Sequence, residues 1–145
     1  MISIPIDQQA ARQWCEQLAR TLPRREIQPG GKPYLTRYYC AGWMPHKRVS
    51  APSLMLHHFV ASDPDHEVHS HPWAWSASLV LVGGYHEQRC THPSELPTLH
   101  TYLPGDVNVI LAADRHRIEL IGSDCWTLFL AGPYLQPWTF HPVCE

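Results

Sequence analysis

The sequence of 145 residues has little charge, and that charge is nearly balanced. Only 17% of its residues are charged, and the formal net charge is −2. The nearest approach to a basic cluster is Arg24-Arg25. Proteins that bind nucleic acid or an anionic membrane surface normally carry a strong positive patch. We therefore expect neither nucleic acid nor a membrane as a partner.

Signals for disulfides, structural zinc and membrane insertion are also missing. The five cysteines are odd in number and include no C-x-x-C pair, which argues against a disulfide framework and a zinc ribbon. No apolar stretch approaches the roughly 20 residues of a membrane helix. The first residues lack the basic segment and apolar run of a signal peptide. We expect a cytoplasmic protein with reduced thiols.

Two common catalytic signatures are absent, while histidine, proline and tryptophan are abundant. The sequence has no G-x-S-x-G motif of a serine hydrolase and no glycine-rich phosphate loop. It contains 11 histidines, 14 prolines and 6 tryptophans. Frequent prolines divide a chain into short elements and turns. The length predicts a single domain over residues 1–145 with a substantial core.

One helix is predicted near the N-terminus, over residues 7–22. Asp7 can cap its first turn, and Pro23 ends it. Apolar residues recur there at helical spacing, so this stripe is expected to pack on the core. The stripe consists of Ala10, Ala11, Trp14, Cys15, Leu18 and Leu22.

Residues 34–131 are predicted to form short β-strands. The segments are 34–40, 54–61, 67–75, 77–82, 85–90, 98–103, 107–111, 115–121 and 125–131. Gly83-Gly84 favours a hairpin between the strands it joins. Residues 132–145 are expected to form a tail across the outside of the domain. Many short strands separated by turn residues are typical of an all-β sandwich or barrel.

The most informative feature is the H-x-H run at residues 69–71. On a strand, His69 and His71 point to the same side. His116 alternates with charged residues on both sides, so it should face the apolar interior. Three imidazoles are costly to bury unless each has a partner, and a metal ion supplies one for all three. We expect these histidines to bind one metal ion; imidazole suits Fe, Zn, Cu, Ni or Mn.

With these motifs the chain resembles the cupin superfamily. Cupins carry a first motif, G-x5-H-x-H-x3–4-E-x6-G, and a second, G-x5-P-x-G-x2-H-x3-N. His69, His71 and Gly83 match the first motif, while Gly105 and His116 match the second. The resemblance covers residues 54–131 and is closest to a group of small single-domain cupin-like proteins.

The sequence departs from the cupin motifs at three places. Ser76 stands at the glutamate position, and Leu120 stands at the final asparagine position. The P-x-G element is replaced by residues 111–113, Leu-Ala-Ala. Without the glutamate, the ligand set is similar to the three-histidine sites of thiol dioxygenases and some diketone-cleaving dioxygenases.

The resemblance implies a fold, a metal and a class of reaction. The fold would be an all-β cupin jelly-roll barrel with one N-terminal α-helix and the metal at its mouth. The function would be that of an Fe(II)-dependent dioxygenase, an oxidoreductase acting on a small chelating substrate. Fe(II) is favoured, and Zn, Ni or Mn stay open. A non-enzymatic cupin module that binds a metal or small ligand, and a cupin isomerase or epimerase, are the alternatives. Cupins often form homodimers, which exposed strand edges favour.

Other residues could act near this metal. Tyr102 and His58 are the candidates for catalytic acid or base, and His57 could face inward in place of His58. Glu87 could orient a ligand histidine or act as a base, although a solvated strand face is the plainer interpretation. Arg37 could hold a substrate carboxylate if its side of the strand faces the interior. Four tryptophans are expected to line and close the cavity: Trp73, Trp75, Trp126 and Trp138.

Overall fold

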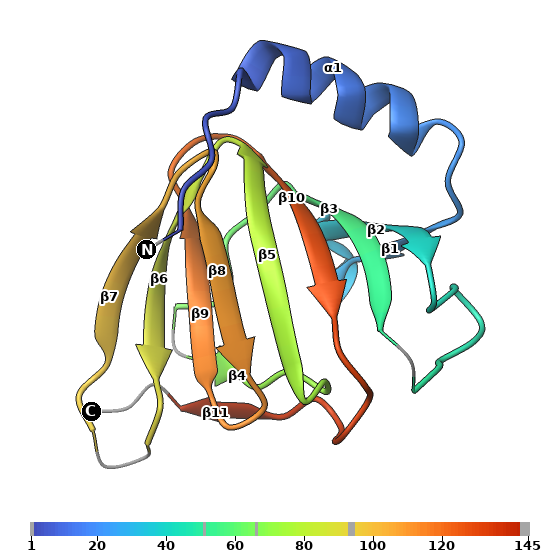
Figure 1. Cartoon of the computed structure of the whole chain (residues 1–145). Helices are drawn as coiled ribbons and strands as arrows, with labels where there is room; N and C mark the ends of the chain where they lie inside the picture. Colours follow the sequence, from blue (N-terminus) through green and yellow to red (C-terminus); the bar gives the residue numbers. More distant parts are fainter. Residues whose placement is uncertain (1, 51, 66, 93–94, 143–145) are drawn as a thin grey trace.

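The computed structural model describes residues 2–50, 52–65, 67–92 and 95–142 (Figure 1). Within these residues it has one α-helix, α1 (Gln8–Ala19), and a short 3-10 helix, η1 (Pro29–Gly31). The strands are β1 (Arg24–Ile27), β2 (Leu35–Ala41), β3 (Ser53–Phe59), β4 (Glu67–His69), β5 (Trp75–Val82), β6 (Tyr85–Cys90), β7 (Thr98–Tyr102), β8 (Val107–Leu111), β9 (Arg115–Leu120), β10 (Cys125–Ala131) and β11 (Phe140–Pro142). In the described part of the chain, no helix is long and apolar enough to cross a membrane.

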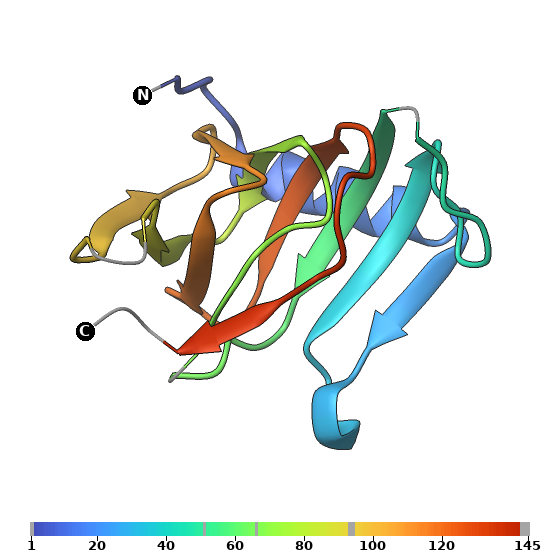
Figure 2. The same cartoon turned by 90° about the horizontal axis from the view of Figure 1, so that it is seen from below.

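The strands form two antiparallel sheets, which confirms the predicted all-β jelly roll with one helix. The larger sheet has the order β1-β2-β3-β10-β5-β8, and the smaller has the order β11-β4-β9-β6-β7. Seen from below, α1 lies behind the larger sheet, on its outer side (Figure 2). The sandwich therefore has an interior between its sheets and a second apolar layer under the helix.

Helix α1 begins as the sequence predicts. The Asp7 carboxylate accepts hydrogen bonds from the backbone N–H groups of Gln9 and Ala10, at 3.0 and 3.1 Å. Cys15 is fully buried against the outer face of the larger sheet. Trp14, however, is 47% exposed. Successive helix residues differ in direction by about 100°, so Trp14 lies beside the packed stripe and not within it.

The predicted strand over residues 67–75 is wrong in its second half. Strand β4 stops at His69, and the chain is irregular until β5 starts at Trp75. Pro72 explains the break, because proline has no backbone N–H and restricts the residue before it. His71 consequently lies in a loop, whereas His69 lies on a strand.

Gly83-Gly84 does not join the two strands of a β-hairpin, so the hairpin predicted at these glycines is wrong. Strand β5 pairs with β10 and β8, whereas β6 pairs with β7 and β9 in the other sheet. The two glycines therefore carry the chain across the sandwich. Gly83 has φ +80°, and a Cβ there would lie 2.3 Å from the carbonyl oxygen of Asp124. Only glycine combines this conformation with so close an approach.

The C-terminal tail is part of the sandwich and not an external strap. Residues 140–142 form β11, which pairs with β4. Strand β1 was also missed, because its four residues are mostly exposed and carry three charges. Both sheets leave edge strands, but nothing in one chain tests the expected homodimer, which stays a prediction.

Buried side chains fall into three groups. One group lies between α1 and the larger sheet and includes Cys15, Leu56 and Trp126. The other two lie between the sheets, around Trp73 at one end and Ile118 at the other. The metal-ligand candidates lie between these last two groups.

Candidate metal centre

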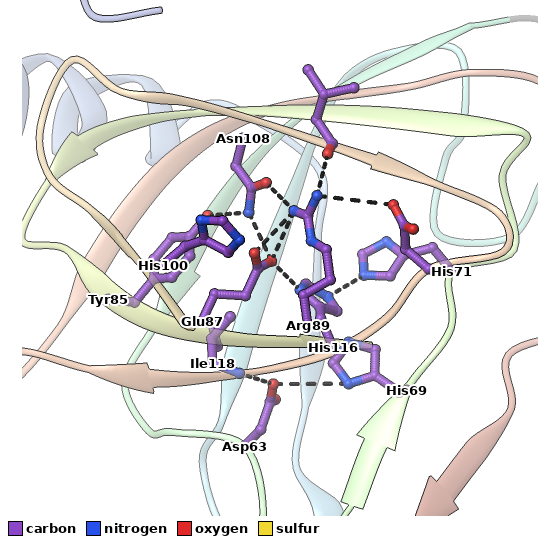
Figure 3. Close-up of polar contacts among 12 residues, drawn as sticks. Asp63, His69, His71, Tyr85, Glu87, Arg89, His100, Asn108, His116 and Ile118 are labelled. Atoms are coloured by element: carbon purple, nitrogen blue, oxygen red, sulfur yellow. Dashed lines mark hydrogen bonds and ion pairs between the residues drawn. The ribbon is translucent and has the colours of Figure 1, made fainter. Parts of the chain in front are cut away.

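Three histidines meet inside the sandwich, as Figure 3 shows. The nearest ring nitrogens of His69, His71 and His116 all lie within 4.8 Å of one another. Nε2 of His71 and Nε2 of His116 are 2.8 Å apart. Two imidazole nitrogens on one metal ion, each bonded at about 2.1 Å, are separated by a similar distance. Three imidazole nitrogens converging in this way fit a divalent transition metal.

Backbone pairing brings these histidines together from distant parts of the sequence. His69 of β4 lies directly opposite His116 of β9 in the antiparallel ladder. Two strands that are far apart in the sequence therefore lie side by side at this point. His71 follows in the loop, where the Gln136 side chain donates hydrogen bonds to the carbonyls of His71 and Ala112, at 2.9 and 2.8 Å. Gln136 thus ties the histidine loop to the turn before β9.

Glu87 lies directly behind His116. Nδ1–H of His116 donates to Oε1 of Glu87 at 2.6 Å, and the glutamate side chain is fully buried. Asn108 donates to the same oxygen at 2.9 Å, and Arg89 forms an ion pair with Oε2 at 2.9 Å (Figure 3). The carboxylate fixes the His116 tautomer with its proton on Nδ1, so that Nε2 is free to bind a metal.

Asp63 lies behind His69 as Glu87 lies behind His116, but at a longer distance. Its Oδ2 lies 3.8 Å from Nδ1 of His69 and accepts the backbone N–H of Ile118 at 2.7 Å. The Tyr34 hydroxyl donates to its other oxygen. The sequence does not single out Asp63, because a buried aspartate next to Pro64 has the same local pattern as a solvated one in a turn.

The local environment keeps His69 and His71 neutral and Glu87 ionised. Burial, together with His116, lowers the pKa of His69 to about 4. Burial also lowers the pKa of His71 well below its ordinary value. Burial alone would raise the pKa of Glu87, but His116, Arg89 and Asn108 outweigh it and lower that pKa to about 2. Neutral imidazole is the form that binds metals.

A cavity of about 630 Å³ opens beside the histidines. This volume lies in the range of small-molecule sites, roughly 300–1,000 Å³. Its walls are mostly apolar and include Trp73, Phe129 and Trp138, while Arg37 and His57 add polar groups. The three histidines lie in its lining. A small molecule in this cavity would therefore contact the ring nitrogens directly.

Known structures share this architecture. The DMSP lyase DddQ from Ruegeria pomeroyi superposes with a TM-score of 0.68 at 13% identity, over 97% of this chain and 70% of the lyase. Fe(II)-HppE gives 0.59 at 13% identity, over 78% of this chain and 57% of HppE. Streptomyces albus HEPD, with 2-hydroxyethylphosphonate and Fe(II) bound, superposes with a TM-score of 0.60 at 16% identity. The match covers 79% of this chain and 25% of HEPD. These structures are cupin-fold metalloenzymes.

This chain has the cupin fold. It spans less than two thirds of HppE and about a quarter of HEPD. No protein-family model matches the sequence, and no curated protein is similar to it in sequence. The shared fold therefore confirms the resemblance seen in the sequence motifs.

Two residues predicted to be catalytic do not line the cavity. Tyr102 packs against Tyr85, with ring centroids 5.4 Å apart. His58 points outward under α1, where it stacks on Trp126 at 3.9 Å and contacts Asp124 at 2.9 Å. Neither side chain lines the cavity. Alternation along β3 turns His57 inward and His58 outward.

The tryptophans divide in the same way. Trp73 and Trp138 line the cavity, whereas Trp126 lies on the outer face of β10 beneath α1. Trp75 packs over Gly132 and does not line the cavity. The helix covers the outer face of β10, so both faces of this strand are apolar. Its sequence therefore does not show which side chains face the interior of the sandwich.

Proposed function

We propose that this cupin is a metal-dependent enzyme that holds one divalent ion on His69, His71 and His116. The observation that carries the proposal is the hydrogen bond from His116 to buried Glu87, since a carboxylate behind a ligand histidine is typical of metal sites. A histidine cluster without such an arrangement has a plainer explanation in packing. Here the tautomer and orientation of His116 are set for an ion at Nε2.

Fe(II) is the favoured metal, and a dioxygenase reaction on a small chelating substrate is the favoured activity. Three neutral ligands leave the ion more positive than two histidines and a carboxylate would, which favours an anionic chelating substrate. The Fe(II) in the HppE and HEPD structures supports this choice of metal through the fold they share. Bound Fe(II) would supply the activation of O2. Zn, Ni and Mn fit the same donors.

The protein's own groups would then bind and orient the substrate and exclude water. Trp73, Phe129 and Trp138 give the cavity apolar walls beside the histidines. Such walls strengthen electrostatic interactions with the bound molecule. Glu87 would hold His116 in place throughout, because Asn108 donates to the same carboxylate oxygen as His116 and Arg89 is ion-paired with the other.

The alternatives differ in what they need from the cavity. An isomerase or epimerase needs an acid and a base at the substrate, and the two candidates for that role, Tyr102 and His58, lie outside the cavity. A non-enzymatic binding module needs only the metal or the ligand. Conversion of a substrate would distinguish an enzyme from such a binding module.

The test is metal content, measured by inductively coupled plasma mass spectrometry on protein purified without a metal-binding tag. We expect about one equivalent of a single transition metal. The double variant His69→Ala/His71→Ala should lose it. The matched control His46→Ala/His86→Ala removes two exposed imidazoles and should keep it. Absence of metal in the wild-type protein, before and after reconstitution, would overturn the proposal.

Activity is tested on the iron-loaded protein with an oxygen electrode and a panel of small hydroxy, keto and thiol acids. Substrate-dependent O2 uptake that the double variant lacks would support a dioxygenase. Substrate conversion without O2 uptake would contradict the dioxygenase and keep the metal-dependent enzyme. Metal binding without any turnover would favour the binding module.

A further inference from the structure

Two arginines lie directly opposite each other where β1 pairs with β2. Arg25 is the partner of Arg37 in the antiparallel register. Opposite residues in such a pair project to the same face a few ångströms apart, and like charges there are destabilising. Both arginines line the cavity beside the histidines. A negatively charged partner between the two arginines would offset their mutual repulsion.

The described residues do not supply that partner. None of the ion pairs found among them includes Arg25 or Arg37. Arg37 is only 7% exposed, and a buried cation without a counter-charge is unusual. Its Nε donates to Nε2 of His57 at 3.3 Å, and its guanidinium lies 5.5 Å from the Trp138 ring. A neutral imidazole and an indole orient the guanidinium without neutralising it.

Arginines outnumber carboxylates in the lining of the cavity. Arg48 also lines it and lies 5.5 Å from the ring of Trp43. Only two carboxylates belong to the lining. Asp63 is occupied by Ile118 and Tyr34, and Glu67 is exposed at the start of β4. The whole chain, in contrast, has a net charge of −2.

Arg37 is close enough to the histidines for one small molecule to reach both. Its guanidinium carbon lies 5.9 Å from the centre of the Trp73 ring. The His71 ring lies 5.7 Å from the same indole. Both groups therefore lie beside the same indole, and all three side chains line a single cavity.

We propose that Arg37, assisted by Arg25 and Arg48, binds an anionic oxygen group at one end of the substrate while the other end reaches the metal. The group is a carboxylate or a tetrahedral oxyanion, since a guanidinium matches both with paired N–H donors. This inference rests on the proposed function for the metal end only. It narrows the substrate class to small acids that carry a second donor group for the metal.

The test uses three thiols. They share the thiol group that would bind the metal and differ in the group at the other end. They are 2-mercaptoethanol, 3-mercaptopropionate and 2-mercaptoethanesulfonate. The protein is loaded with Co(II), which gives a thiolate charge-transfer band, and is titrated without oxygen. We expect at least one of the two anions to bind about tenfold more tightly than the neutral thiol, as one charged hydrogen-bonding contact allows. The stronger anion identifies the carboxylate or the tetrahedral group.

Arg37→Gln should remove most of this preference, and Arg37→Lys should keep part of it. Arg25→Gln and Arg48→Gln change exposed side chains, so they serve if the buried variant fails to fold, and each should reduce the preference. The control is Arg24→Gln, which removes the same charge next to Arg25 from a side chain that does not line the cavity. Its preference should equal that of the wild-type protein.

A wild-type protein without preference for the anions would overturn the subsite. So would a preference that the Arg25, Arg37 and Arg48 variants all retain. Failure of the metal centre is detected separately, as absence of the Co(II) band with every thiol. In that case the metal-free protein is titrated with 3-mercaptopropionate, and the tryptophan indole N–H signals are followed by NMR. Shifts that Arg37→Gln abolishes would preserve the subsite, and absence of shifts would reject it.

Discussion

Glu87 lies 2.6 Å from Nδ1 of His116 and is fully buried on the neighbouring strand. A carboxylate in this position ordinarily costs stability, but Arg89 and Asn108 satisfy it here. In the motif of the cupin superfamily, the glutamate position falls on Ser76 of β5. This chain instead places a carboxylate on β6, behind a ligand. The carboxylate would therefore act on a bound metal through a histidine.

Glu87→Gln is expected to weaken metal binding about 10- to 100-fold, because replacing the partner of a ligand histidine has effects of that size. The amide oxygen can still accept from His116, but it lacks the charge that polarises the ring. Affinity is measured by competition with a chromophoric chelator. Glu119→Gln, an exposed change on the adjacent strand, is the control and should bind as the wild type does. Equal affinities for both variants would remove Glu87 from the metal site.

The position of Glu87 could be inferred in part from the sequence. Tyr85 and Glu87 share one face of β6, and the apolar Tyr85 marks that face as buried. The charged neighbours of His116 similarly revealed its phase, which the structure confirms. The inward side of β10 could not be inferred, because α1 and the cavity make both of its faces apolar. The alternation of apolar and polar residues along a strand predicts which side chains are buried. Which of two buried faces lines the cavity can be learned only from the fold.

Contacts between distant segments account for the rest of what the sequence missed. Gln136 reaches His71 from 65 residues away. Arg25 becomes a neighbour of Arg37 only through a short exposed strand that lacks an apolar pattern. Gly83-Gly84 has the signature of a hairpin but crosses between sheets, since turn chemistry specifies backbone conformation and not the strand partner.

The metal-free protein should lose stability as the pH falls from about 6.5 to about 4. His69 has a pKa of about 4 when folded, against the ordinary 6.5, so the unfolded chain binds more protons in this range. Its contribution is present above 6.5 and is lost as the pH falls toward 4, to a limit of about 3 kcal/mol. Glu87, with a folded pKa of about 2, acts in the same direction below its ordinary value of 4.5.

Urea unfolding in the presence of a chelator, at several pH values across this range, measures the effect. In His69→Gln the slope of unfolding free energy against pH should become shallower. A slope unchanged by the substitution would show that other groups cause the acid sensitivity.

Asp124 is expected to stabilise the helix and to leave the metal site unaffected. Its two oxygens accept from the two terminal nitrogens of Arg12 at 2.8 Å each, and one also contacts His58 at 2.9 Å. Asp124→Asn should lower the free energy of unfolding by about 1–2 kcal/mol, as loss of charged hydrogen bonds does. The control Asp65→Asn changes a carboxylate that is 85% exposed and should have little effect. Lost metal in Asp124→Asn would contradict this assignment.

His58→Gln tests the sequence-based catalytic candidate directly. His58 stacks on Trp126 under α1, outside the cavity, so the variant should keep full metal content and the affinity for 3-mercaptopropionate in the Co(II) titration. Its stability should fall modestly, because a ring stack and a contact to Asp124 are lost. Unchanged stability with weakened binding would reverse that assignment and return His58 to the site.

Gln136→Ala should loosen the metal site from the side of the C-terminal tail. The Gln136 amide joins the carbonyls of His71 and Ala112, and it thereby fixes the His71 loop against the turn that leads to His116. Without it, His71 must be ordered when the metal binds, so the affinity should fall about tenfold, while His69 and His116 remain paired through the backbone. Chelator competition measures the loss, and Gln136→Glu is the informative companion. The ionised carboxylate has no N–H to donate to the two carbonyls, so this variant should be no better than alanine. Wild-type affinity in both variants would show that the tail holds the cavity wall without positioning the ligand.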